Sequence, residues 1–201
     1  MNRVVIASNN PGKLRELGAL LETVGIQASP QSEFHVTEAE EPHDTFLENA
    51  LAKARNASRA TGLAALADDS GLCVGALGGA PGVHSAHYAG KRGAREERDA
   101  RNNAKLVAAL AARPDRSAFY YCVLVLLRAP DDPTPIVADG TWHGRIVLEP
   151  RGAGGFGYDP YFEVAPGVTA GELAAAEKNR VSHRAQALAA LAARLRTTSA
   201  S

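Results

Sequence analysis

Asp68 and Asp69 are adjacent carboxylates, and their side chains are suited to acid–base or metal chemistry. They follow the apolar run 64–67 and precede Ser70 and Gly71. This order predicts a buried strand that ends at the carboxylates, and open α/β sheets bind ligands just beyond the carboxyl ends of their strands. Two close carboxylates repel each other, and a divalent cation is the usual way to keep both ionised. The alternative is a polar turn chosen for its backbone geometry alone.

Further carboxylates precede this pair in the acidic connection 33–44, which includes Glu40 and Glu41. Most acidic runs are solvated surface. If this one lies beside the acidic end of the strand, Glu40 or Glu41 meets the two aspartates at one cation. Neighbouring side chains of a strand point to opposite faces, so Asp68 and Asp69 act together only if the backbone turns. The glycine two residues after Asp69 permits such a turn.

A second group of candidate residues lies in the loop 8–13, between a predicted buried strand at 3–7 and a helix. A polar, glycine-containing loop before a helix suits an anion, because free backbone N–H groups and the helix dipole favour negative charge. Lys13 adds a positive charge, and Ser8 and Asn10 add neutral donors. The spacing is not that of a Walker P-loop. The loop is therefore a candidate phosphate site, although such a loop with a lysine is also common without one.

The next predicted helix spans about 45–62 and places another lysine near the carboxylates. Thr45 and Glu48 fit a capping box at its start, and Gly62 is a natural stop. Lys53 lies on a polar stripe of this helix. A lysine there usually points to solvent, but it reaches a phosphate if the helix begins beside the acidic strand end.

The segment 150–160 is rich in glycine around Phe156, Tyr158 and Asp159. So much glycine indicates a backbone that approaches a flat ligand closely, with an aromatic ring available for stacking. The alternative is a mobile glycine loop.

The start of the last predicted helix carries two basic residues. Ser182 can cap this helix, which leaves His183 and Arg184 in its first turn. Basic residues there oppose the helix dipole. A local rule broken without visible compensation often marks a functional site.

The elements between these segments predict an α/β protein. Residues 119–127 form an almost unbroken apolar run, which is typical of a central strand. Residues 142–147 suggest a strand, a turn and a second strand. The segment 78–88 suggests a flexible loop, and its two histidines lack companions for a metal site.

Composition excludes several classes of protein. The chain has 201 residues, 45% hydrophobic content and equal numbers of acidic and basic residues. Its zero net charge argues against broad, charge-driven binding to nucleic acid or to a membrane. Two cysteines without metal-like spacing are expected to be buried and reduced. No apolar run is long enough for a signal peptide or a bilayer span, so we expect a cytoplasmic protein with a flexible tail at about 197–201.

Six motifs in order resemble the HAM1-like inosine/xanthosine triphosphate pyrophosphatases, over nearly the whole chain. They are Ser8-x-Asn10-x-x-Lys13, Thr45-Phe46-x-Glu48-Asn49-Ala50, Ala67-Asp68-Asp69-Ser70-Gly71-Leu72, Gly78-Gly79-x-Pro81-Gly82, Gly155-Phe156-Gly157-Tyr158-Asp159-Pro160 and Glu177-Lys178-Asn179-x-x-Ser182-His183-Arg184. Each motif is weak alone, and the six in sequence are specific.

The resemblance implies one domain over 1–201, with an elongated mixed β-sheet, flanking helices and two lobes around a central cleft, usually as a homodimer. It implies Mg²⁺-dependent hydrolysis of inosine and xanthosine triphosphates, and of their deoxy forms, to the monophosphate and pyrophosphate. The implied catalytic residues are Asp69 as general base with Asp68, Lys13 and Lys53. The implied metal ligands are Glu40, Glu41 and Asp69. The implied substrate contacts are Ser8, Asn9, Asn10, Pro11, Gly12, Lys13, Ser70, Phe156, Gly157, Tyr158, Asp159, Lys178, His183 and Arg184.

Two other functions remain open at this point. One is a related pyrophosphatase of the Maf type, which would act on modified pyrimidine nucleotides. The pair His183–Arg184 and the segment 155–159 weigh against it. The other is a non-catalytic nucleotide-binding regulator, which would have no need of Asp68, Asp69 and the acidic run together.

Overall fold

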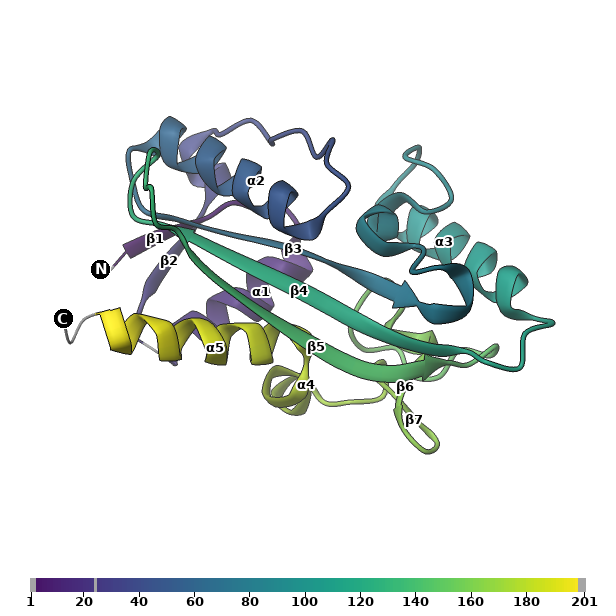
Figure 1. Ribbon diagram of the computed structural model, residues 1–201. Coiled ribbons are helices and arrows are strands. Elements are labelled where there is room, and N and C mark those ends of the chain that lie inside the picture. The colour runs from purple at the N-terminus through teal and green to yellow at the C-terminus, as the bar shows by residue number, and fades with distance from the viewer. Residues whose placement is uncertain (1–2, 24, 199–201) are drawn as a thin grey trace. The chain divides into compact units, whose positions relative to one another are not determined.

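The computed structural model describes residues 3–23 and 25–198, which form helices and a mixed sheet (Figure 1). The strands are β1 (Arg3–Ile6), β2 (Gln27–Pro30), β3 (Ala65–Val74), β4 (Ser117–Leu127), β5 (Ile136–Ile146), β6 (Phe162–Ala165) and β7 (Val168–Thr169). The α-helices are α1 (Pro11–Glu22), α2 (Phe46–Thr61), α3 (Arg95–Leu110), α4 (Ala175–Val181) and α5 (His183–Thr198). Short 3₁₀ helices are η1 (Gln31–Phe34), η2 (Gly75–Leu77), η3 (Gly82–His87) and η4 (Asp159–Tyr161).

The strands of the described residues form one sheet in the order β2-β1-β3-β4-β5-β6-β7. β1 pairs in parallel with β2 and β3, whereas β6 pairs antiparallel with β5 and β7. The predicted mixed α/β sheet with flanking helices is therefore confirmed. The apolar run 119–127 lies in β4, the middle strand, as predicted. The central cleft stays a prediction.

β3 differs from the strand that the sequence suggested. The strand was predicted to end at the acidic pair, but β3 is ten residues long in all and continues past the pair to Val74, so that strand end is wrong and the alternative of a polar turn is also excluded. The parallel register explains why the pair still lies at a strand end. Ile6, the last residue of β1, pairs with Leu66, so Asp68 and Asp69 extend just past the carboxyl end of β1.

β5 is also continuous, so the predicted turn within 142–147 is wrong. Its glycines allow other parts of the chain to approach closely. A Cβ atom on Gly140 would lie 2.3 Å from the carbonyl oxygen of His183, and one on Gly144 would lie 2.4 Å from that of Glu163. The glycines therefore serve close packing rather than a turn.

The chain divides into two compact units. Unit 1 comprises Met1–Asp69, Cys122–Gly140 and Ser182–Ser201, and unit 2 comprises Ser70–Tyr121 and Thr141–Val181. Strands β3, β4 and β5 each contribute residues to both units.

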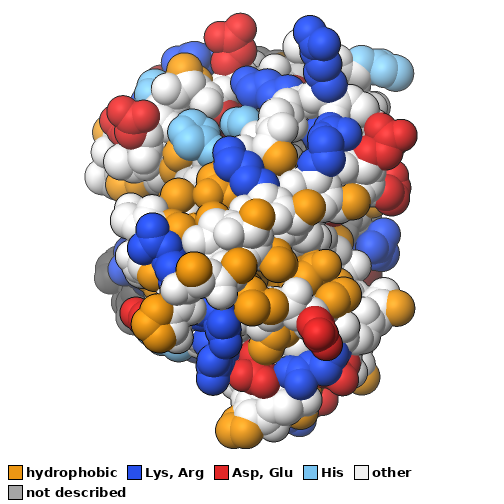
Figure 2. Space-filling view, turned by 90° about the vertical axis from the view of Figure 1, so that its right-hand side faces the viewer, with side chains coloured by type: hydrophobic (Ala, Val, Ile, Leu, Met, Phe, Trp, Pro, Cys, Tyr) orange, Lys and Arg blue, Asp and Glu red, His pale blue; other side chains and the backbone are white. Residues whose placement is uncertain are grey.

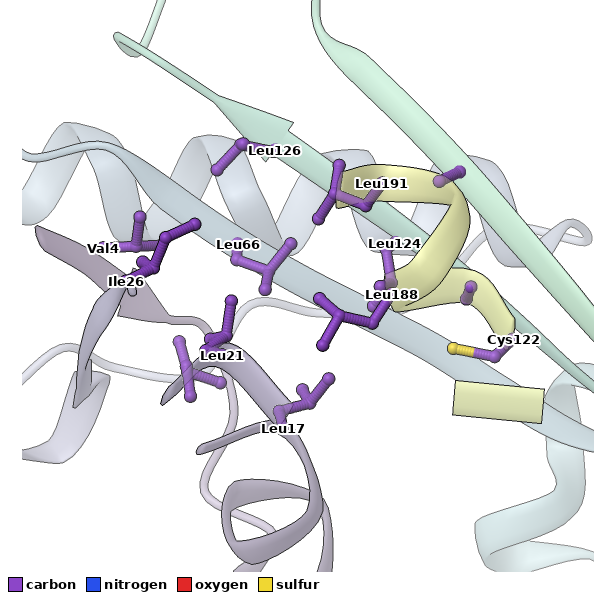
Figure 3. Close-up of a cluster of buried hydrophobic side chains, with 13 residues drawn as sticks. Val4, Leu17, Leu21, Ile26, Leu66, Cys122, Leu124, Leu126, Leu188 and Leu191 are labelled. Carbon is purple, nitrogen blue, oxygen red and sulfur yellow. The ribbon is translucent and has the colours of Figure 1, made fainter. Parts of the chain in front are cut away.

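Unit 1 has a core of aliphatic side chains between its strands and two helices. Figure 3 shows Leu17 and Leu21 of α1 and Leu188 and Leu191 of α5 directed toward Leu66 of β3 and its neighbours. These side chains are at most 4% exposed. In Figure 1, α2 covers the other side of these strands. Burial of the apolar faces of α1, α2 and α5 therefore supplies the main driving force for unit 1.

Unit 2 has its own core, which is richer in aromatic side chains. Phe162 of β6 is fully buried and contacts the rings of Tyr120 and Trp142 edge-on, with centroids 4.7 and 5.5 Å apart. The segment 78–88 contains η3 rather than the predicted flexible loop. Buried Ser85 ties it to β3, because its Oγ accepts a hydrogen bond from the N–H of Leu72 at 2.9 Å.

The predicted helix caps are largely confirmed. Thr45 Oγ1 accepts a hydrogen bond from the N–H of Glu48, and Gly62 ends α2 in the left-handed conformation. Ser182 Oγ accepts a hydrogen bond from the N–H of Ala185 in α5. The backbone of α5 includes positions 197 and 198, where a tail was predicted, and 199–201 lie outside the described residues.

The surface on one face mixes both signs of charge. Figure 2 shows a band of hydrophobic side chains on this face, with Lys, Arg, Asp and Glu side chains interspersed around it. This mixture agrees with the zero net charge of the sequence. Among the described helices, none is long and apolar enough to span a bilayer.

Candidate active site

Asp68 and Asp69 point to opposite sides of β3, and each contacts different residues. On one side, Asp68 Oδ1 lies 2.9 Å from Lys13 Nζ and Asp68 Oδ2 lies 3.2 Å from Arg184 Nε. On the other side, Asp69 Oδ1 lies 2.8 Å from Lys53 Nζ of α2. The alternation of side chains along a strand thus persists through the acidic pair. The geometry favours separate functions for the two carboxylates rather than one shared cation.

Asp68 is fixed as a buried anion. Burial would raise the pKa of its carboxyl, but Lys13, Arg184 and Lys53 together outweigh burial and hold that pKa below its usual range. A carboxylate with so low a pKa is a weak base. The arrangement therefore favours Asp68 as the residue that holds Lys13 and Arg184, rather than one that accepts a proton.

Asp69 has the opposite electrostatic balance. Burial raises the pKa of its carboxyl and outweighs the opposing effects of Lys53 and Lys13. Burial would lower the pKa of Lys53, but Asp69, Glu41 and Asp68 together raise it above its usual value. Lys53 therefore stays protonated, and Asp69 is the more basic carboxylate of the pair.

The second carboxylate oxygen of Asp69, Oδ2, is available to bind a ligand or to accept a proton. Asp69 Oδ2 is buried and accepts no hydrogen bond from any part of the chain that the structure describes. Glu41 lies close by, because its Oε1 is 3.0 Å from the same Lys53 Nζ, and its side chain is 40% exposed. Mg²⁺ prefers oxygen ligands and usually binds through one or two carboxylates together with water and phosphate oxygens. Asp69 and Glu41 therefore offer oxygen atoms of the type that a divalent cation binds.

No protein-only metal site is present within residues 3–23 and 25–198, since no group of three or more His, Cys, Asp or Glu side chains is arranged to hold an ion. The other predicted binding residues differ in exposure. Glu40, Asn9 and Pro11 are exposed, Ser70 is half-buried in β3, and His183 is 2% exposed at the start of α5. Exposure leaves the first three accessible to a ligand.

The predicted phosphate loop is shorter than expected, because α1 begins at Pro11. Asn10 caps this helix, and its Oδ1 accepts hydrogen bonds from the N–H groups of Gly12 at 2.9 Å and Lys13 at 3.2 Å. Ser8 Oγ accepts a hydrogen bond from the N–H of Asn10. The prediction of free backbone N–H groups is therefore wrong at Gly12 and Lys13. The Lys13 ammonium group remains the positive charge of this segment.

Arg184 explains how α5 tolerates basic residues in its first turn. Besides Asp68, its guanidinium contacts Glu16 of α1 through Nη1. Arg184 is 2% exposed, so these two carboxylates compensate a charge that is removed from water. The predicted contact between Arg184 and a purine base stays a prediction, and two carboxylates already engage this side chain.

Within unit 2, the ring of Phe156 lies next to two cations. Lys178 Nζ and Arg95 Cζ are each 4.8 Å from its centroid. Asp159 Oδ2 accepts a hydrogen bond from the N–H of Phe156 at 2.7 Å and lies 2.8 Å from Lys178 Nζ. Tyr158 is 4% exposed, and its hydroxyl donates to the carbonyl oxygen of Ser85 at 2.8 Å. These contacts fix the glycine-rich segment in place, which disfavours the alternative of a mobile loop.

Comparison with known proteins decides the family. A model of the Ham1 family matches residues 4–194. The chain belongs to the Ham1 family. It is 65% identical over 195 residues to the dITP/XTP pyrophosphatase of Burkholderia pseudomallei (strain K96243), covering 96% of this chain and 93% of that protein. It is 62% identical over 197 residues to the dITP/XTP pyrophosphatase of Ralstonia nicotianae, covering 98% of each.

Solved structures agree with this assignment. The HAM1 protein from Coxiella burnetii superimposes with a TM-score of 0.87 at 48% identity, covering 98% of this chain and 100% of that one. The resemblance that the six motifs indicated is therefore confirmed for the Ham1 family. The similarity to the named relatives extends over 96–98% of this chain and so includes both of its units.

The structure adds site residues that sequence reasoning missed. Glu16 lies three positions after Lys13, so both lie on one face of α1, and this spacing was a usable signal. Arg95 is the first residue of α3, a helix with several arginines, and such a run of charges usually indicates solvated surface. Cys122 Sγ lies 3.9 Å from Asp68 Oδ2, a contact between residues far apart in the sequence that no local pattern indicates.

Proposed function

We propose that this Ham1-family chain hydrolyses non-standard purine nucleoside triphosphates, namely dITP, ITP, XTP and dXTP, to the monophosphate and pyrophosphate, and so cleanses the nucleotide pool. The observation that carries the proposal is the state of Asp69. One of its oxygens is held by Lys53 at 2.8 Å, and the other is buried without a hydrogen-bond partner among the described residues. The names of the relatives support the substrate class.

Asp69 acts as the general base in this proposal. Lys53 fixes the orientation of the carboxylate, which leaves Oδ2 to accept a proton from the attacking water. Burial raises the pKa of Asp69, and a more basic carboxylate takes that proton more readily. General-base catalysis of this kind contributes roughly 10²- to 10⁴-fold in rate.

The lysines stabilise the phosphates. Lys13 and Lys53 carry positive charge on the two sides of β3, and both are shielded from water, with side-chain exposures of 14% and 11%. A charge in a poorly solvated site interacts strongly with developing negative charge on pyrophosphate. Glu41, with water and phosphate oxygens as further ligands, would hold Mg²⁺, which supplies charge neutralisation of the phosphate oxygens when it is bound.

Selectivity for the purine base follows from the N–H donors of Lys178 beside the ring of Phe156. Lys178 is held next to Phe156 by Asp159, so it presents N–H donors near a surface that can stack on a base. Inosine and xanthine carry an oxygen acceptor at position 6, whereas adenine carries an amino donor there. A buried donor that faces the amino group is left unpaired, which disfavours adenine.

Product analysis of the purified chain tests the proposal. The substrates are ITP, dITP, XTP, GTP, ATP and dTTP with Mg²⁺, and anion-exchange chromatography separates the products. We expect monophosphate and pyrophosphate from the inosine and xanthine nucleotides, with loss of turnover on chelation and recovery with Mg²⁺. Orthophosphate with nucleoside diphosphate would contradict the proposal.

The same panel separates the two alternatives. Turnover of dTTP in preference to ITP would favour a Maf-type pyrimidine enzyme. Thermal stabilisation by ITP without turnover of any nucleotide would favour a binding protein. The homodimer that the resemblance implies is also a proposal, and its test is the mass in solution by light scattering.

A further inference from the structure

Two side chains of helix α3 form hydrogen bonds with the backbone of Gly157, which lies in the segment that the proposed function assigns to binding of the purine base. Asp99 Oδ2 accepts a hydrogen bond from the N–H of Gly157 at 3.2 Å. Asn103 Nδ2, one turn further along α3, donates to the carbonyl oxygen of the same glycine at 3.0 Å. Two side chains of one helix thus engage both polar groups of one residue.

A third side chain extends this stripe. Arg95 lies one turn before Asp99, its guanidinium is 4.8 Å from the centroid of Phe156, and its Nε is 3.7 Å from Asp99 Oδ2. Residues four apart on a helix lie on the same face. Arg95, Asp99 and Asn103 therefore form a stripe, here called the α3 stripe, which faces Phe156 and Gly157.

The segment has a physical need for such a stripe. Gly155 and Gly157 flank Phe156, and both have positive φ, +74° and +64°. A Cβ on Gly157 would meet nothing within 4 Å, so this glycine serves the backbone conformation rather than close packing. Glycine is the residue with the most conformational freedom to lose. Without partners, the position of the Phe156 ring would be poorly defined.

We propose that the α3 stripe, and Asp99 and Asn103 above all, are positioning residues that pre-order Phe156 and Gly157 for the purine base. The inference rests on the proposed function and adds residues to it. Ordering a binding segment before the ligand arrives lowers the entropic cost of binding. Loss of the stripe should therefore weaken substrate binding while chemistry at Asp69 continues at its normal rate.

The groups that face the segment from other elements do not replace the stripe. Asp159 of η4 accepts from the N–H of Phe156, and Lys178 of α4 lies over the ring. Neither the hydrogen bond nor the cation–π contact involves Gly157. Asn103 is 8% exposed, so its contact is shielded from competition by water. The stripe and the pair Asp159–Lys178 thus hold different parts of the segment.

The test compares Asp99→Ala with Asp99→Asn, which keeps an acceptor for the Gly157 N–H. For Asp99→Ala we expect a KM for dITP about 5- to 10-fold higher, the effect of losing one charge-assisted hydrogen bond. We expect kcat within about twofold of the wild type, because the proposal assigns the stripe to the segment that binds the purine and not to the reacting phosphates. The KM of Asp99→Asn should lie much closer to the wild-type value than that of Asp99→Ala. Glu96→Ala, at an exposed position of α3, should have the wild-type KM.

Amide hydrogen exchange supplies a readout without substrate. In Asp99→Ala the Gly157 N–H should exchange about tenfold faster or more, with the melting temperature close to that of the wild type. If Asp99→Ala does not fold, Asn103→Ala is measured in its place. Wild-type KM and wild-type exchange in the variants would overturn the positioning role and leave the proposed function intact. Failure of the wild type to hydrolyse dITP would overturn the proposed function, and this inference with it.

Discussion

Neighbouring aspartates on one strand experience different environments because a strand alternates its side chains. Asp68 faces Lys13 and Arg184, which keep it ionised, whereas Asp69 has one lysine and an oxygen without a partner among the described residues. The residue types and their order in the sequence predicted two carboxylates at a ligand site. They did not predict the division of functions, because that depends on which of the distant residues pack on each side of β3.

Asp69→Asn should abolish most of the activity without unfolding the protein. The amide cannot accept the proton of water, so we expect kcat for dITP to fall by ~100-fold or more. The amide oxygen can still accept a hydrogen bond from Lys53, and Glu41 remains beside that lysine, so the melting temperature should fall less than in Asp68→Asn. Steady-state kinetics and thermal unfolding check both points, and near-native turnover would remove Asp69 from the role of base.

Asp68→Asn should show the reverse pattern and serves as the matched substitution. It leaves Arg184 and Lys13 with one fewer anion in a buried site, and breaking a buried ion pair costs about 3–5 kcal/mol. We therefore expect a large loss in the free energy of unfolding, measured by urea denaturation. A stability equal to that of Asp69→Asn would contradict the assignment of Asp68 as the residue that holds the two cations.

At the scale of elements, local signals predicted the helices better than the strands. The caps at Thr45 and Ser182 are properties of a few neighbouring residues, and both were predictable. The acidic pair predicted an early end to β3, and the glycine within 142–147 predicted a turn in β5; neither exists. Gly144, like Gly140 before it, instead allows the backbone of a distant segment to approach closely, which a local pattern does not contain.

Gly140→Ala tests this explanation of β5. The new Cβ would lie 2.3 Å from the His183 carbonyl oxygen and 2.6 Å from the backbone nitrogen of Ala187, so we expect clear destabilisation, of about 1–3 kcal/mol. Gly18→Ala is the control, because a Cβ there meets nothing within 4 Å inside α1. That substitution should stabilise the protein by about 0.5–1 kcal/mol. Equal melting temperatures for the two variants would contradict the packing argument.

At the scale of the whole molecule, residues far apart in the sequence make up each unit. The cluster around Asp68 joins α1, β3 and α5, and the cluster around Phe156 joins α3, η4 and α4. The order of the motifs along the chain identified the family, and that identification is confirmed. Partners within each cluster, such as Glu16 and Arg95, required the fold, because side-chain contacts at long range leave weak traces in a single sequence.

Hydrolysis of dITP in H₂¹⁸O tests the central claim most directly, because the product pair alone does not say which phosphorus water attacks. If water activated by Asp69 attacks the α-phosphorus, mass spectrometry will find one ¹⁸O atom in dIMP and none in pyrophosphate. Asp69→Asn should slow this incorporation in parallel with turnover. Label in pyrophosphate would mean attack at the β-phosphorus and would contradict the mechanism proposed for this chain.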